Sequence, residues 1–153
     1  MLDLIRENVV AFKAIFTVQA PEKTTADEIL SLFKPDFSDS GSNFYEKEEE
    51  LYEYWVEFVR DCCDGKTGIE PNEIMTFATG VEKKPPLGWG CGAMPSLMFQ
   101  DSYDEKSKKE SPLLQARTCG PTIIIPRYDS GSYEVFRAKA IFSFGNSPSI
   151  LLE

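Results

Sequence analysis

Four cysteines and the absence of histidine define the chemistry that is open to this chain of 153 residues. The cysteines are Cys62, Cys63, Cys91 and Cys119. Serine-protease triads, cysteine–histidine dyads and the His-Glu-x-x-His zinc motif all need imidazole, so all three are excluded within this sequence. Zinc ligands and redox disulfides need cysteines two to four residues apart, and no such pair is present. Any catalysis by these residues must therefore proceed without imidazole, and a cysteine thiol is the nucleophile to examine.

Cys119 has the most informative surroundings of the four cysteines. It follows Arg117 and Thr118, precedes Gly120, and stands just before a run of β-branched residues over 122–125. A loop at the end of a strand is a frequent place for function. A neighbouring cation and free glycine amides favour the thiolate, which is the nucleophilic form of cysteine. Thr118 could orient the thiol or could simply bond to the local backbone. Taken alone, these residues leave both a reactive and an inert Cys119 open.

Composition and charge exclude several classes of protein. Hydrophobic residues make up 42% of the chain and charged residues 27%, which is typical of a globular domain. There are 16 Lys and Arg against 25 Asp and Glu, a net charge of -9 that disfavours general binding to nucleic acid or anionic lipid. Asp3, Arg6 and Glu7 interrupt the apolar core that a signal peptide needs, and no eighteen apolar residues run together, so neither a signal peptide nor a membrane span is expected. With so few cysteines, a reducing, intracellular location is expected.

The first third of the chain predicts two helices followed by a hinge. Apolar residues from Leu2 to Phe16 recur at steps of three and four, which predicts a core-packing helix. A second, shorter helix is predicted from the N-cap Thr25 to Lys34, where a proline follows. The segment 35–43 is rich in Pro, Ser, Asp and Gly, so we expect a linker or hinge there.

The middle of the chain predicts a long amphipathic helix. Leu51, Trp55, Phe58 and Cys62 recur at steps of four, three and four, and glutamates crowd the turns before them, where the helix dipole favours anions. Gly65 is expected to end this helix. Cys62 falls on its packing face and is therefore expected to be buried.

The remainder predicts an α+β fold with a small sheet packed against several helices. We expect a helix over 71–80, a loop over 81–100 with a short strand at 97–99, a charged surface loop over 101–112, a strand over 122–125 that ends at Pro126, and a last helix over 133–144 capped by Ser132. A partly alternating pattern over 133–144 leaves a strand open there.

The order of these features is more specific than any one of them. It comprises a helix with Trp55, a Phe-x-Thr-Gly element at Phe77, Thr79 and Gly80, a loop with Pro85, Pro86 and Gly88, a Thr-Cys pair at Thr118 and Cys119, an apolar strand with Ile123 and Ile125 that leads into Pro126 and Tyr128, and then Tyr133 and Glu134. In this order and spacing the chain resembles the C-terminal lobe of HECT-type ubiquitin ligases, over roughly residues 45–145.

The resemblance implies a fold, an activity and a set of partners. Residues 45–153 would form the lobe with the catalytic cysteine, and residues 1–44 the helical end of the preceding N-terminal lobe with its hinge. Cys119 would accept ubiquitin as a thioester from a ubiquitin-conjugating enzyme and pass it to a lysine of a protein substrate, with Thr118 as an orienting residue. No cofactor or metal is implied, nor any nucleic acid or membrane partner. The expected location is the cytoplasm, with the nucleus also open.

Several positions depart from the family's pattern. Arg117 stands where the family often has histidine, Gly120 and Pro121 replace an aromatic–asparagine pair, and two extra residues lengthen the turn around Gly131. The lobe that docks the conjugating enzyme is not included, so we expect an incomplete domain that is weakly active or inactive alone. The alternative is a catalytically inactive HECT-like module that binds ubiquitin or a protein partner, with Leu87 and Trp89 as candidate contacts.

Overall fold

The computed structural model is an α+β fold, as the sequence predicts. It describes residues 23–85, 88, 89, 94–101, 103, 104, 109, 110 and 112–146. Within these ranges there are four helices, α3 (Ala26–Leu32), α4 (Tyr45–Cys63), α5 (Pro71–Thr79) and α6 (Tyr133–Gly145). The helix expected over 2–16 lies outside the described residues. The last element is a helix, which decides between the two structures that its sequence left open.

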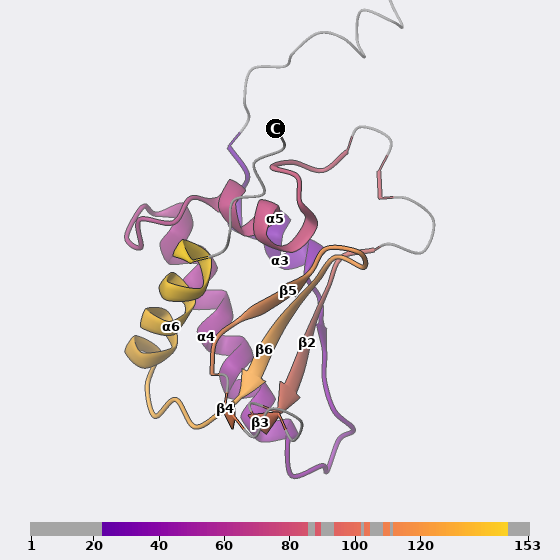
Figure 1. Cartoon of the computed structure of the whole chain (residues 1–153), viewed down its shortest axis with the longest axis vertical. Coiled ribbons are helices and arrows are strands. Elements are labelled where there is room, and N and C mark those ends of the chain that lie inside the picture. The colour runs from indigo at the N-terminus through magenta and orange to yellow at the C-terminus, as the bar shows by residue number, and fades with distance from the viewer. Residues whose placement is uncertain are drawn as a thin grey trace, which may run out of the picture.

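A small mixed sheet forms the second layer (Figure 1). Its strand order is β1-β2-β6-β5, and the strands are β1 (Pro35–Asp36), β2 (Ser96–Asp101), β6 (Thr122–Arg127) and β5 (Gln115–Arg117). β1, β2 and β6 run parallel, while β5 is antiparallel to β6. Two further short strands, β3 (Tyr103–Asp104) and β4 (Lys109–Glu110), pair within the region predicted as a charged loop.

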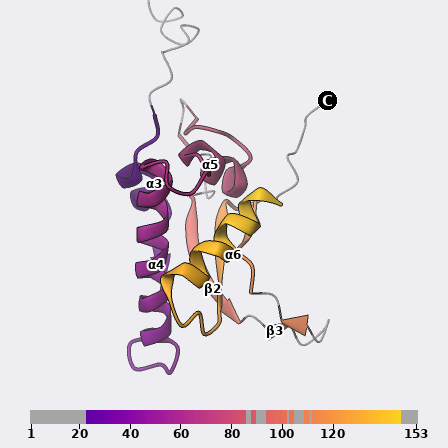
Figure 2. The same cartoon turned by 90° about the vertical axis from the view of Figure 1, so that its left-hand side faces the viewer.

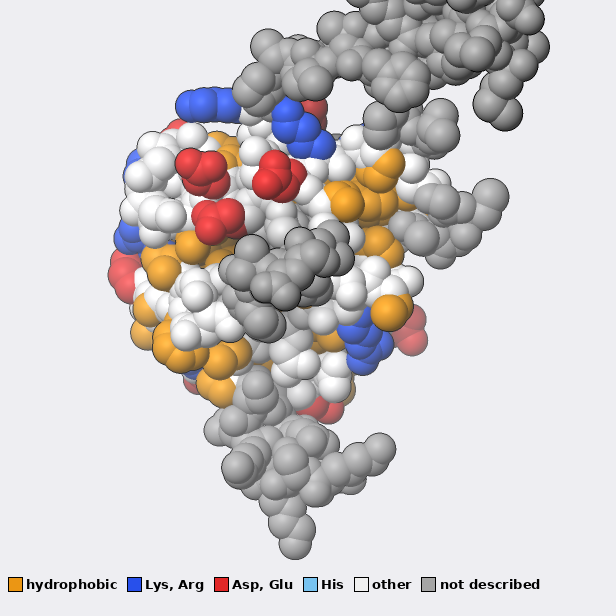
Figure 3. All heavy atoms as spheres, turned by 45° about the horizontal axis from the view of Figure 1, so that its top comes forward, with side chains coloured by type: hydrophobic (Ala, Val, Ile, Leu, Met, Phe, Trp, Pro, Cys, Tyr) orange, Lys and Arg blue, Asp and Glu red, His pale blue; other side chains and the backbone are white. Residues whose placement is uncertain are grey.

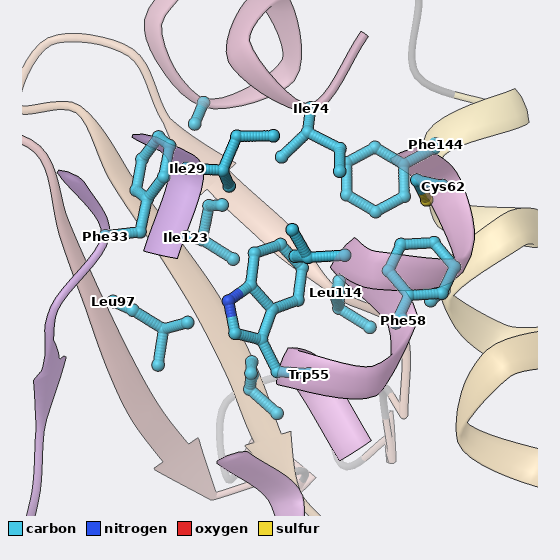
Figure 4. Close-up of a cluster of buried hydrophobic side chains, with 14 of the residues drawn as sticks. Ile29, Phe33, Trp55, Phe58, Cys62, Ile74, Leu97, Leu114, Ile123 and Phe144 are labelled. Carbon is cyan, nitrogen blue, oxygen red and sulfur yellow. The ribbon is translucent and has the colours of Figure 1, made fainter. Parts of the chain in front are cut away.

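The core lies between the sheet and its helices. α4 runs along the sheet and α6 lies beside α4, as the two views in Figures 1 and 2 show. In Figure 4 the ring of Trp55 points from α4 toward Ile123 and Leu97 on the central strands. All three side chains are fully buried. This packing holds β6 in place, and with it the end of the sheet at Thr122, where β6 begins.

Local signals set the start of α3 and the end of α5 as predicted. The Thr25 hydroxyl accepts a hydrogen bond from the Glu28 amide, and the Glu28 carboxylate accepts one from the Thr25 amide, which completes a capping box. Gly80 ends α5 in the left-handed conformation, with φ of 75°, where a side chain would be strained. Ser132 stands at the N-cap of α6, but its side chain makes no capping hydrogen bond.

The segment predicted as a linker or hinge, 35–43, is irregular over 37–43 but opens with a short strand. Pro35 and Asp36 form an edge strand, and the Leu97 amide donates to the Lys34 carbonyl oxygen at 3.0 Å. An edge strand tolerates proline because one side of its backbone needs no partner. The preceding helix α3 places Ile29 in the same core as α4. α3 and β1, which lie in the segment 1–44 expected to end an N-terminal lobe, therefore pack against the rest of the described structure.

The strand predicted to end at Pro126 continues to Arg127. Antiparallel pairing with β5 reaches only as far as Ile124, so Pro126 faces no β5 residue that would need its missing amide hydrogen. On its other side Pro126 lies opposite Gln100 in the parallel pairing with β2. The strand therefore passes through the proline without losing a hydrogen bond to β5.

The burial of α3 leads to a stability prediction. Ile29→Ala should lower the free energy of unfolding by about 3 kcal/mol, because it leaves a cavity in the shared core. Chemical denaturation followed by tryptophan fluorescence measures the change, and Ser31→Ala, on the exposed side of the same helix, is the control. An Ile29→Ala variant as stable as the control would mean that α3 is not part of the cooperative fold.

Candidate functional site

Cys119 lies in the turn of the β5–β6 hairpin. Residues 118–121 make the turn, Arg117 is the last residue of β5, and Thr122 opens β6. Arg117 and Thr122 are opposite one another in the ladder. The Cys119 side chain is exposed, and its thiol is free. The sequence correctly predicted a loop before a buried strand, but it gave no signal for β5, so the hairpin itself is a finding of the structure.

The turn is attached to the sheet on the side that follows Cys119. The Pro121 carbonyl oxygen accepts a hydrogen bond from the Ser96 amide at 2.9 Å. The Gly120 carbonyl oxygen accepts one from the Thr122 hydroxyl at 2.7 Å. Pro121 is buried, whereas Gly120 is exposed. The exposed Cys119 thiol therefore lies two residues before the point, Pro121, at which the chain enters the core.

Thr118 and Arg117 remain beside the thiol but take no defined role in the structure. Both side chains are exposed. Neither has a side-chain hydrogen bond or ion pair to another residue of the described part of the chain. An orienting role for Thr118 therefore stays an expectation from the resemblance.

The other cysteines have different environments. Cys62 is 3% exposed on the packing face of α4, as predicted, and burial raises the pKa of its thiol to about 11, although the Thr67 hydroxyl opposes the shift by donating to its sulfur at 3.2 Å. Cys63 is exposed, and the pKa of its thiol is raised by partial burial and by the charge of Asp64. Cys91 lies outside the described residues.

These environments predict the order in which the cysteines react. Cys119 should be alkylated well before Cys62, because the Cys62 sulfur is shielded and forms little thiolate near neutral pH. Labelling with iodoacetamide at limiting reagent, followed by peptide mass spectrometry, measures the order. Faster labelling of Cys62 would contradict the structure, and faster labelling of Cys63 would count against Cys119 as the reactive thiol.

Several residues of the motifs described above pack in or against the hydrophobic core. Phe77 on α5 packs against Phe144 on α6, with ring centroids 4.6 Å apart. Tyr128, which follows β6, is buried, and the Lys139 ammonium lies 3.5 Å from the centroid of its ring. Trp89 is half-buried against the core rather than free on the surface. Leu87, the other contact expected for a binding module, lies outside the described residues.

A second polar group of residues lies at the other end of the parallel strands. Fully buried Glu48 accepts hydrogen bonds from the Ser38 amide at 2.6 Å and the Ser38 hydroxyl at 2.7 Å. Arg127 Nε donates to the same carboxylate at 2.6 Å, and Arg127 Nη1 donates to Asp101 at 3.0 Å. The arginine also lies over the ring of Phe44. Since all its charged groups are paired, this cluster joins the loop after β1, helix α4 and strands β2 and β6 as a structural network.

The position of Glu48 in the sequence is a signal for this network, although periodicity alone assigns that position to an apolar residue. Glu48 precedes Leu51 by three residues and Trp55 by seven, so it falls on the apolar stripe of α4. A carboxylate at a core position needs a partner. The cation that meets it, Arg127, is 79 residues away, and no local pattern points to it.

The described residues were compared with the patterns of metal-binding and membrane-spanning segments. Within the described ranges, no group of three or more His, Cys, Asp or Glu side chains is placed to hold a metal ion. None of the helices in those ranges is long and apolar enough to cross a membrane. Figure 3, which turns the upper end of Figure 1 toward the viewer, shows hydrophobic, acidic and basic side chains mixed over the visible surface.

Comparisons with known proteins add no family assignment. A scan against protein-family models and a search of curated proteins each found no significant match to this chain.

Proposed function

We propose that this chain is the cysteine-bearing lobe of a HECT-type ubiquitin ligase and that Cys119 carries ubiquitin as a thioester. The observation that carries the proposal is the position of Cys119: an exposed thiol in the turn of a hairpin whose second strand is buried in the core. Such a thiol can meet a large protein partner while its backbone stays fixed. The ordered motifs around it, including Trp55, Phe77 and Tyr128, support the family.

The first step exchanges one thioester for another. The Cys119 sulfur attacks the carbonyl carbon of the thioester that joins ubiquitin to its conjugating enzyme. The bond from that carbon to the conjugating enzyme's sulfur breaks, and the released sulfur takes up the proton that Cys119 gives up. A thioester is already activated, so this step needs a thiolate and correct orientation rather than a histidine base.

The second step forms an amide on the substrate. The nitrogen of a substrate lysine attacks the carbonyl carbon, and the bond from that carbon to the Cys119 sulfur breaks. The lysine ammonium loses two protons in all; one returns to the sulfur of Cys119 and the other passes to solvent. Because this chain has no histidine, a base that it supplies for the attacking amine would be a carboxylate, and the rest of the ligase could supply the base instead.

Ubiquitin loading of a fusion protein tests the proposal. The chain is joined to the N-terminal lobe of a HECT ligase and incubated with activating enzyme, conjugating enzyme, ATP and fluorescent ubiquitin. On a nonreducing gel we expect a ubiquitin adduct that disappears on addition of a thiol, and far less adduct on the chain without the added lobe. Positioning of the donor thioester is worth several kcal/mol of activation barrier, and the added lobe supplies it.

Two variants make the result specific. Cys119→Ala should abolish the adduct, while Cys63→Ala, which removes the other exposed thiol of the described region, should leave it unchanged. If the fusion with intact Cys119 formed no thiol-sensitive adduct, the proposal that Cys119 carries ubiquitin as a thioester would be rejected. Binding of ubiquitin without an adduct would then favour the catalytically inactive module.

A further inference from the structure

The residue after Cys119 is a glycine, and the freedom of its backbone would affect the position of the Cys119 sulfur. Gly120 has no side chain and adopts many backbone conformations at little cost. A cysteine followed by glycine in an exposed turn would therefore point its sulfur in many directions. Thioester exchange needs the reacting atoms about 3–3.5 Å apart and aligned, so such freedom would slow it.

Two hydroxyl side chains meet beneath this turn. Ser96 is the first residue of β2 and Thr122 the first residue of β6, and they lie opposite each other in the parallel pairing. Their hydroxyl oxygens are 3.1 Å apart, and both side chains are half-buried. The Thr122 hydroxyl donates to the Gly120 carbonyl oxygen at 2.7 Å. A hydroxyl group has one proton, and that of Thr122 is donated to the Gly120 carbonyl oxygen. The Ser96 hydroxyl is therefore the donor in its hydrogen bond to the Thr122 hydroxyl oxygen.

Ser96 and Thr122 bind the turn by hydrogen bonds to the carbonyl oxygens of two successive residues. The Ser96 amide holds the Pro121 carbonyl oxygen at 2.9 Å, and the Thr122 hydroxyl holds that of Gly120. The proline ring also fixes its own φ angle. On the other side of the turn, ladder pairing with Thr122 fixes Arg117. Thr118 and Cys119 are thus left between two anchored points.

We propose that the Ser96–Thr122 hydroxyl pair is a positioning device that holds the turn in one conformation and so sets the direction of the Cys119 sulfur. Its effect on thioester exchange rests on the proposed function, whereas its effect on the turn does not. Thr122 and Ser96 touch neither substrate nor the reacting sulfur, so they are positioning residues. The expected phenotype is slower chemistry with unchanged docking of the conjugating enzyme.

The test compares Thr122→Val, which keeps the branched shape but loses the hydroxyl, with Thr122→Ser, which keeps the hydroxyl. Thr76→Val is the matched control, because the Thr76 hydroxyl bonds only within α5. The first measurement is the backbone order parameter of the Gly120 amide by NMR relaxation of the full chain. We expect about 0.85 in the parent chain and in Thr122→Ser, and a fall toward about 0.6 in Thr122→Val.

The second measurement is the rate of ubiquitin loading in the fusion protein. Thr122→Val should lower the maximal rate about tenfold with little change in the concentration of conjugating enzyme that gives half-maximal rate, because only orientation is lost. Thr122→Ser and Thr76→Val should load within about twofold of the parent. Alkylation of Cys119 by iodoacetamide should also stay within about twofold in all variants, because a small reagent can approach a mobile thiol from any direction.

The outcomes separate the two proposals. A Gly120 amide that stays equally ordered in Thr122→Val overturns the positioning role, whatever the loading assay gives. A mobile turn with undiminished loading overturns it as well. A mobile turn in Thr122→Val together with no loading of the parent fusion supports the hydroxyl pair as the device that orders the turn and rejects the ubiquitin transfer.

Discussion

Glu48→Ala is expected to lower the free energy of unfolding by about 3 kcal/mol, since breaking a buried ion pair leaves the partner's charge uncompensated. Arg127 would lose its bond to Glu48 but keep Asp101, which places the loss at the lower end of the range for buried pairs. Ser38 would lose both of its bonds to the carboxylate. Urea denaturation measures the change.

The control for this prediction is Glu53→Ala, which removes an exposed glutamate from the same helix. Its effect should be within about 0.5 kcal/mol. If Glu48→Ala were no less stable than Glu53→Ala, the network would not hold the loop after β1, helix α4 and the sheet together.

The same carboxylate should make stability depend on pH. Burial alone would raise the pKa of Glu48, but hydrogen bonds from Ser38 and Arg127 and the charge of Arg127 outweigh burial and hold the pKa below its ordinary value of 4.5. A carboxyl with a lowered pKa in the folded state stabilises the fold above the unfolded value and loses that contribution as the pH falls through the folded value. The stability difference between the parent and Glu48→Gln should therefore be largest near neutral pH and should narrow below about pH 4.5.

Cys119→Ser is expected to change the chemical nature of the ubiquitin adduct in the fusion protein. A serine hydroxyl would form an oxyester, which thiols do not cleave, but it is a weaker nucleophile than a thiolate and would load slowly. The adduct should therefore survive reducing agent, disappear in mild hydroxide, and give no transfer to lysine above background. The measurement is a gel time course with and without reducing agent.

Cys63→Ser provides the comparison for this experiment. Its adduct should remain sensitive to thiols, because Cys119 is still present. An adduct in Cys119→Ser that remains thiol-sensitive would mean that another cysteine carries ubiquitin.

Periodicity predicted α4 because this helix buries one continuous stripe, whereas signals at the helix ends predicted α3, α5 and α6. Leu51, Trp55 and Phe58 repeat over several turns of α4, and such a repeat is visible in the sequence. Strands β1 and β5 have two and three residues, too few for any period to register. They form because β2 and β6 offer free edges, which depends on tertiary pairing and not on local preference.

The candidate site shows the same division between local and distant information. Cys119 before a buried strand is a local feature, and the sequence identified it. The hydroxyl pair beneath the turn joins Ser96 to Thr122, 26 residues apart, and neither residue is unusual in its own segment. The short strand inside the expected linker was missed for a related reason, since Pro35 and Asp36 have the composition of a loop but lie beside Leu97 and Met98.

The most informative experiment on the proposed function asks whether Cys119 alone can carry ubiquitin. In the fusion, every other cysteine, including Cys62, Cys63 and Cys91, is replaced by alanine, and the loaded protein is analysed by intact mass spectrometry under nonreducing conditions. The proposed function predicts a single added ubiquitin that is released by a thiol, and no added ubiquitin when Cys119 is replaced and the other three cysteines of this chain are retained. A folded protein with Cys119 as its sole cysteine that gains no ubiquitin, or a Cys119→Ala protein that still gains one, would contradict it.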